Sequence, residues 1–161
     1  MAYSFDATVG GSTSTSYIEV STAATFISFE QTEAAYAVDW SSLSSTAQQA
    51  YLMKATRAVD SLNVEGAKSN DDQRLKFPTD LQDDETIIPE KVQHAVCLEA
   101  FARAQGPSEF REDAMWNVKS SSRGNKSITY SGHRASGFAS AEAFDLLKSY
   151  VNTSTISLSR W

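Results

Sequence analysis

The sequence predicts a mainly α-helical fold, a small helical bundle with a β-hairpin and an extended C-terminal tail. Two segments, residues 46–62 and 89–105, carry apolar side chains at the spacings of three and four that are typical of amphipathic helices. After the second of them, weakly alternating residues flank a turn, which favours a hairpin. The chain has 161 residues, a length typical of one domain with appendages.

The N-terminal part is expected to hold a flexible arm followed by short helices. Residues 1–16 are rich in Gly, Ser and Thr and have little to bury, so they are expected to be flexible or to be ordered by a partner. Ser21 is predicted to cap a helix over about 22–31. A second short helical segment is predicted over 33–38, with Trp40 in the core beside it. The inward positions of the first helix are expected to be Ala24, Phe26 or Ile27, and Phe29.

Helix 46–62 is the most clearly periodic element of the chain. Ser44 or Ser45 is expected to cap it, because a serine hydroxyl can accept a bond from a free amide of the first turn. Its apolar stripe is predicted at Leu52, Ala55, Val59 and Leu62.

Helix 89–105 is predicted to be the most buried helix of the bundle, which spans residues 17–106. Pro89 occupies the first helical position, where its missing N–H costs nothing, and Gly106 ends the helix. Apolar residues cover most of its circumference: Val92, Ala95, Val96, Leu98, Ala100, Phe101 and Ala102.

The connection 63–88 is unusually long for a compact domain and carries seven acidic residues. Loops of this kind tend to be functional or to take part in assembly. Within residues 107–140, which we assign to a hairpin and loop, the hairpin is predicted at about 115–119 and 127–131 around a turn at Ser122–Asn125.

Residues 141–161 are predicted to form a short helix and the C-terminal tail. The helix is expected over Ala141–Val151, where apolar side chains recur at helical spacing. In the tail, Ile156 and Leu158 lie two residues apart, the pattern of a strand that could pair with the edge of a partner sheet.

Charge is distributed unevenly along the chain, whose net charge is −6. Residues 1–100 carry 15 acidic and 6 basic side chains, whereas residues 101–161 carry 5 acidic and 8 basic ones. An acidic body repels phosphate, so tight wrapping of DNA is disfavoured. Unlike ends suit a head-to-tail or ring assembly of identical subunits, although chance unevenness of a solvated surface gives the same pattern.

Several protein classes do not fit the sequence. No apolar run reaches the roughly 18 residues of a transmembrane helix. The first residues lack the basic and apolar regions of a signal peptide, so none is expected. The single cysteine, Cys97, excludes an internal disulfide framework and fits a reducing compartment.

No set of residues predicts catalysis, a metal or a cofactor. His94 and Cys97 have a spacing that could supply two metal ligands, but no second pair accompanies them, and core packing is the favoured interpretation. The loop carboxylates are interpreted as solvated rather than as ligands of a hard cation: Asp71, Asp72, Asp80, Asp83, Asp84 and Glu85. We therefore expect that the chain is not an enzyme.

A group of basic and aromatic residues follows the bundle: Arg123, Lys126, Tyr130, His133 and Arg134. Positive charge interleaved with aromatic rings is typical of surfaces that bind single-stranded nucleic acid. Because only one aromatic residue interleaves here, a solvated hairpin or an interface with an acidic protein surface is favoured.

Five segments, in this order, resemble a family of small tailed-phage proteins: SYIEVSTAATF, QQAYLMKATRAVDSL, QRLKFP, IIPEKVQHAVCLEAFA and VKSSSRGNKSITYS. The family is the head–tail connector adaptor or head completion protein, whose members also carry the label DnaT-like single-stranded-DNA-binding protein. The resemblance covers about residues 16–160. The chain departs from the pattern at Val64, where an aromatic residue is expected, and in its unusually acidic 80–86 loop.

The resemblance implies a structural virion protein of a bacteriophage. Copies are expected to form a dodecameric ring that docks on the portal protein and joins the head to a downstream tail or connector protein. DNA would pass through the lumen during genome packaging and ejection without specific binding. The ring would lie at the head–tail interface of the virion after assembly in the host cytoplasm, with no cofactor and no membrane contact. The alternative function is a single-stranded-DNA-binding module.

The C-terminal helix and tail are the predicted portal-binding region. Trp and Arg are enriched at binding hot spots, and a helix this short is marginal without tertiary support. The residues assigned to portal binding are Phe144, Leu147, Val151, Ile156, Leu158, Arg160 and Trp161.

Overall fold

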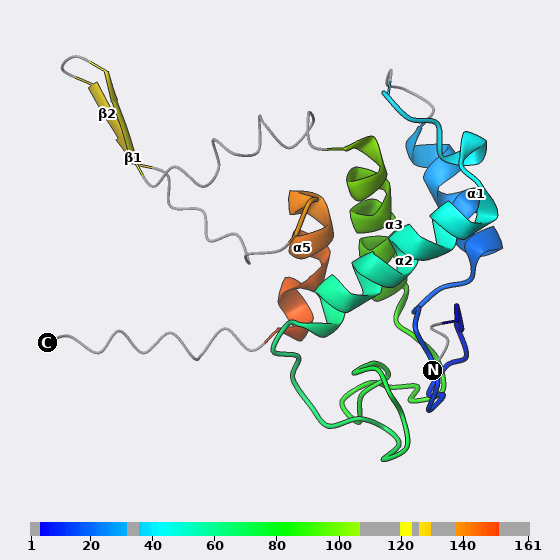
Figure 1. Cartoon of the computed structure of the whole chain (residues 1–161). Coiled ribbons are helices and arrows are strands. Elements are labelled where there is room, and N and C mark those ends of the chain that lie inside the picture. Colours follow the sequence, from blue (N-terminus) through cyan, green and yellow to red (C-terminus); the bar gives the residue numbers. More distant parts are fainter. Residues whose placement is uncertain (1–3, 32–35, 107–119, 124–125, 130–137, 152–161) are drawn as a thin grey trace, which may run out of the picture.

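The computed structural model describes residues 4–31, 36–106, 120–123, 126–129 and 138–151, and this part of the chain is mainly helical, as the sequence predicts (Figure 1). Its α-helices are α1 (Val20–Glu30), α2 (Ser45–Asp60), α3 (Glu90–Gln105) and α5 (Ala141–Leu147). Single turns of 3₁₀-helix occupy Trp40–Ser42 and Lys148–Tyr150. None of the described helices is long and apolar enough to cross a membrane.

The two central helices begin and end close to the predicted positions. Ser44 caps α2, because its hydroxyl accepts a hydrogen bond from the backbone N–H of Ala47. Pro89 precedes the first residue of α3, and Gly106 follows its last residue with a φ of 85°, a left-handed conformation that glycine adopts without steric cost.

Helix α1 differs from the prediction in its cap and in its inner face. The predicted Ser21 cap is wrong, because the helix already begins at Val20 and the carbonyl of Glu19 accepts the N–H of Ala23. Ala23 and Ile27, four residues apart, form the buried stripe. Phe29 is 74% exposed, since two residues beyond Ile27 it lies about 200° further round the helix.

The short helical segment predicted at 33–38 is absent from those of its residues that the structure describes. Residues 32–35 lie outside the described part, and residues 36–38 are not helical. Trp40, by contrast, is 1% exposed and fills the core as expected.

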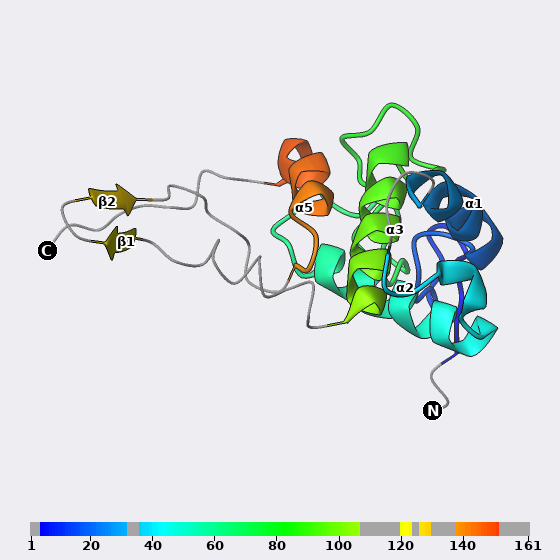
Figure 2. The same cartoon turned by 90° about the horizontal axis from the view of Figure 1, so that it is seen from above.

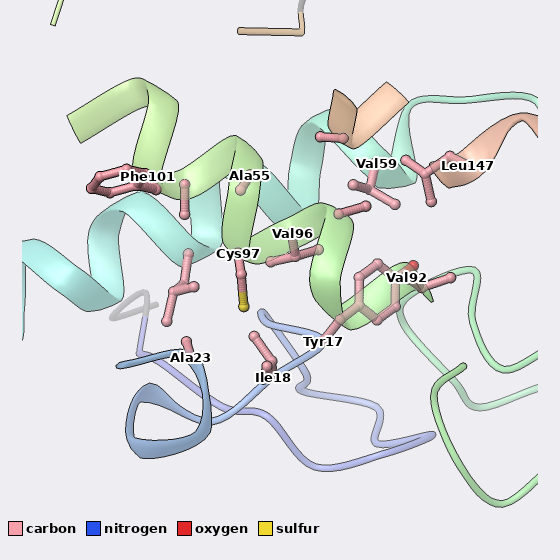
Figure 3. Packing of buried hydrophobic residues seen from close by; sticks show 14 of the residues in the cluster. Tyr17, Ile18, Ala23, Ala55, Val59, Val92, Val96, Cys97, Phe101 and Leu147 are labelled. Atoms are coloured by element: carbon pink, nitrogen blue, oxygen red, sulfur yellow. The ribbon is translucent and has the colours of Figure 1, made fainter. Parts of the chain in front are cut away.

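Helix α3 is the centre of the bundle and contacts α1, α2 and α5 (Figures 1 and 2). Its buried side chains meet those of α2, so the predicted stripe of Leu52, Ala55, Val59 and Leu62 is confirmed as part of the core. Figure 3 shows Val96 and Cys97 of α3 among side chains from α1, α2 and α5. The core extends beyond residue 106 to Phe138, Ala143 and Leu147.

The described residues of the N-terminal arm fold back against the long connection 63–88. The carbonyl of Asp6 accepts hydrogen bonds from the backbone N–H groups of Thr15 and Ser16, and Ser14, Thr15 and Ser16 are buried. The carbonyl of Gly11 accepts a bond from the N–H of Arg74, which joins the arm to the connection. These contacts order both segments without helix or strand.

Two short strands, β1 (Ser120–Arg123) and β2 (Lys126–Thr129), pair antiparallel, with Arg123 opposite Lys126 and Ser121 opposite Ile128. The strand β2 overlaps the predicted 127–131, whereas β1 begins after the predicted 115–119, which lies outside the described residues. Isolated bridges also pair Val64 with Val151 and Lys68 with Thr79.

Candidate functional site

The predicted portal-binding region is described only in its helical half. Leu147 is 1% exposed and belongs to the core, so it serves the chain's own fold. Phe144 is half-buried against Phe138, with ring centroids 5.7 Å apart. Val151 is half-buried and bridges to Val64. The remaining residues assigned to portal binding lie outside the described part: Ile156, Leu158, Arg160 and Trp161.

A fully buried carboxylate ties α5 to α3. The side chain of Glu99, on α3, is 0% exposed. Both of its oxygens accept the backbone N–H of Ala139 at 2.8 Å, and Oε2 also accepts the N–H of Ser140 at 2.8 Å. Arg103, one helical turn further on, donates from Nε to Oε1 at 2.7 Å. The residue just before α5 is thereby held by a charge-assisted hydrogen bond.

Burial raises the pKa of the Glu99 carboxyl above its ordinary value, against the amide donors of Ser140 and Ala139 and the charge of Arg103, which act to lower it. Sequence reasoning did not single out Glu99. The available signal was a glutamate on the helix predicted to be the most buried, with an arginine four residues later as a partner.

The QRLKFP segment organises the long connection from within. The side chain of Gln73 is 2% exposed, and its Nε2 donates to the carbonyls of Leu75 and Pro78 at 2.8 and 2.9 Å. Lys68 Nζ donates to the carbonyl of Gln73 at 2.8 Å, and Lys76 Nζ donates to that of Leu62 at 2.5 Å. Both ammonium groups therefore bind backbone carbonyls of the chain itself.

A phenol joins the start of the bundle to the same segment. Tyr17 Oη donates to Asp60 Oδ1 at 2.6 Å and accepts the backbone N–H groups of Lys76 and Phe77 at 3.0 and 3.2 Å. The ring of Tyr17 also meets that of Phe77 edge-on, with centroids 5.7 Å apart. Burial and the neighbouring Asp60 carboxylate raise the pKa of Tyr17, so the phenol stays neutral and keeps its donor.

The outer side of the connection is acidic and partly apolar. Leu81 and Ile87 are 67% and 55% exposed, so they add apolar surface to this side. Exposed carboxylates lie between them in the sequence: Asp83, Asp84 and Glu85. We call the segment Thr79–Ile88 the acidic loop. Asp84 accepts from the N–H and hydroxyl of Thr86, which lowers the pKa of its carboxyl.

His94 and Cys97 take part in packing. The ring of His94 stacks on Phe26 at a centroid distance of 4.2 Å, and its Nε2 lies 3.5 Å from Glu90 Oε1. Burial raises the pKa of the Cys97 thiol to about 12, so it stays protonated. Within the described ranges, no group of three or more His, Cys, Asp and Glu side chains is arranged to hold a metal ion.

The basic and aromatic residues after the bundle fall partly in the two strands. Arg123 and Lys126 are the facing residues at one end of β1 and β2. Tyr130, His133 and Arg134 lie outside the described part of the chain.

The model of one protein family, described as "Putative DnaT-like ssDNA binding protein", matches residues 5–160. The chain belongs to this family. The prediction that it belongs to a family with the DnaT-like label is therefore confirmed. The match covers the arm, the bundle, the acidic loop, the two strands and most of the tail. No curated protein and no solved structure matches the chain.

Proposed function

We propose that the chain is a structural adaptor of a tailed-phage virion, which forms a ring on the portal protein and joins the head to the tail. DNA passes through the lumen of this ring without specific binding. The downstream side of the ring meets a tail or second connector protein. The resemblance of five ordered segments to head–tail connector adaptors supports the proposal.

The charge of the body is the structural observation that supports it best. The described parts 4–31, 36–106 and 138–151 contain 16 acidic and 8 basic side chains. A surface with this excess of carboxylates repels phosphates. A channel through which DNA slides requires this property, because it must not bind the phosphates tightly. The portal contact is assigned to the predicted C-terminal tail and to the exposed parts of Phe144 and Val151, which precede the tail in the sequence.

The test is co-sedimentation with purified portal rings. Adding the full chain should increase the mass of the portal by about twelve subunits, the increment that the resemblance implies. Deleting residues 152–161 should leave the helical content unchanged by circular dichroism and abolish the increment. Deleting residues 1–3 is the matched control and should leave it intact. A chain that never binds portal rings contradicts the adaptor proposal.

The family description favours a second function, the binding of single-stranded DNA. Residues 114–141 contain four basic side chains and no acidic one, and positive charge of this kind attracts a phosphate backbone. The mobility of a labelled oligonucleotide, measured at about 50 and about 200 mM salt, separates the two functions. Strong, salt-dependent retardation that disappears in Arg123→Ala/Lys126→Ala would establish this function in place of passive passage of DNA.

A further inference from the structure

Charge is unevenly distributed over the described part of the chain. Helix α2 carries no acidic residue before Asp60, and its two basic side chains, Lys54 and Arg57, are exposed. The connection 63–88, by contrast, carries seven acidic residues and three basic ones: Lys68, Arg74 and Lys76. If each of these three cations is paired with one of the seven carboxylates, four carboxylates still remain. The connection is therefore acidic whatever its basic side chains contact.

The outer face of α2 combines small and basic side chains. Its members follow one another at spacings of three and four, on the side opposite the buried stripe of the same helix: Ala47, Ala50, Lys54 and Arg57. Lys54 Nζ lies 5.5 Å from the centroid of the Tyr51 ring, which attracts the ammonium group. Arg57 Nε donates to the carbonyl of Met53 at 3.3 Å, and a guanidinium keeps its charge in any such contact. We call this stripe of four residues the basic face.

The acidic loop and the basic face lie on different sides of the molecule. The acidic loop ends at Ile88, just before the N-terminal end of α3, and Figure 2 shows the connection beyond this end of the helix. Helix α2 crosses α3 on the other side, and its basic face points away from α3, because the buried stripe of α2 packs against α3 (Figures 1 and 2). The acidic loop therefore does not cover the basic face of its own chain.

We propose that the acidic loop of one copy of the chain binds the basic face of α2 on a second copy, head to tail. The three consecutive carboxylates of the loop meet Lys54 and Arg57, whose charge is complementary. The exposed aliphatic side chains of Leu81 and Ile87 pack beside them against Ala50, whose small side chain permits close approach. The contact joins unlike surfaces, so it can repeat from copy to copy and close a ring.

An acidic protein segment fits the basic face better than nucleic acid does. A nucleic-acid strand is held by many phosphate contacts, and a face with two cations supplies few of them. A bound strand would also leave Leu81 and Ile87 in solvent, whereas the acidic loop brings both its charge and its apolar surface into the contact.

The proposal deepens the ring adaptor by naming the contact between its subunits, and it rests on that function only for the closure of the ring. A contact between one loop and one helix face is small and is weak in a single pair of copies. It gains strength in a closed ring, where each subunit is held on two sides.

The experiment is sedimentation equilibrium of the full chain, without portal, from about 10 μM to about 1 mM protein. The wild-type chain should self-associate at about 50 mM salt, and association should weaken at about 200 mM salt. Asp83→Lys/Glu85→Lys and Lys54→Glu/Arg57→Glu should each weaken it about ten-fold or more. The two variants mixed in equal amounts should recover association, because the reversed loop of one then meets the reversed face of the other.

Matched controls separate the contact from the effect of net charge and from misfolding. Asp71→Lys/Asp72→Lys makes the same change of charge as the loop variant, at exposed positions outside the acidic loop, and should associate like the wild type. Lys54→Glu alone leaves Arg57 and its contacts in place and should still weaken association about three-fold or more. Lys148→Glu makes the same single reversal at a lysine whose side chain is 60% exposed, and it should have no effect.

Four results would overturn the proposal. A wild-type chain that stays monomeric throughout would show that the contact does not form. A control that weakens association as much as its matched variant, or a mixture that does not recover, would show that the contact lies elsewhere. If Lys54→Glu leaves self-association unchanged but abolishes the retardation of a labelled oligonucleotide, the basic face binds nucleic acid instead.

The inference and the adaptor function can fail separately. Binding to portal rings without self-association would keep the adaptor function and remove this inference. Self-association that follows the charge variants, without binding to portal rings, would keep this inference and remove the adaptor function.

Discussion

Two regions are attached to the bundle in different ways. The start of α5 is bound to α3 by a buried carboxylate, whereas the long connection is bound to α2 through a neutral phenol. At the first junction, the carboxylate of Glu99 is fully buried and accepts the N–H groups of Ala139 and Ser140. At the second, Tyr17 shares the N–H of Lys76 with Asp60, which is only half-buried. The first junction depends on one group, whereas the second spreads its bonds over two.

The two junctions differ in what happens to the backbone N–H donors when their acceptor is removed. A buried charge must be satisfied by fixed donors, and donors arranged around it have no other acceptor once it is removed. In the shared network, the N–H of Lys76 has a second acceptor in Asp60 Oδ1 at 2.7 Å. The α3–α5 junction should therefore fail as a unit, and the connection should weaken by degrees.

The largest effect is expected from Glu99→Ala. The substitution leaves the N–H groups of Ala139 and Ser140 without their carboxylate and should cost about 3–5 kcal/mol in the free energy of unfolding, measured by urea titration. Hydrogen exchange should increase first in α5. Glu90→Ala, on the same helix with 82% of its side chain exposed, is the control and should cost less than about 0.5 kcal/mol. Equal losses in the two variants would contradict the special role of the buried carboxylate.

A smaller effect is expected from Tyr17→Phe. The ring keeps its contact with Phe77, but the N–H of Phe77 loses its acceptor and Asp60 loses the hydrogen bond from the phenol. The loss should be about 1–2 kcal/mol in the same titration. Tyr36→Phe removes a hydroxyl from an exposed tyrosine and should be nearly neutral. A loss as large as that of Glu99→Ala would mean that the two junctions are equally cooperative.

The smallest effect is a difference in pH dependence between the wild type and Glu99→Gln. Because burial raises the pKa of Glu99 in the folded state, the folded chain binds a proton more tightly than the unfolded chain. This contribution to stability is fully present below the ordinary pKa of 4.5 and is lost as the pH rises through the folded pKa.

The variant has no carboxyl to titrate at this position, and all other ionisable groups are shared. The free energy of unfolding of the wild type, minus that of the variant, should therefore fall as the pH rises above 4.5. A difference that stays constant, or that rises with pH, would show that the amide donors and Arg103 outweigh burial.

The helices that bury a continuous stripe could be predicted from the sequence alone. The spacing of Leu52, Ala55 and Val59 places them on one side of any α-helix, and the caps at Ser44 and Gly106 follow from local chemistry. Helix α1 was less determined, because its apolar residues at 26, 27 and 29 fit more than one inner face. Packing against α3 selected Ile27 and left Phe29 in solvent.

The tertiary structure alone decided how the irregular segments attach. Glu99 and Ala139 are 40 residues apart, and Tyr17 and Lys76 are 59 apart, so no local pattern links them. Leu147 looked like an anchor for a partner, because a short amphipathic helix presents the same stripe to a neighbouring protein as to its own core. The spacing of apolar residues predicts which face of a helix is covered, but only the tertiary structure decides which segment covers that face.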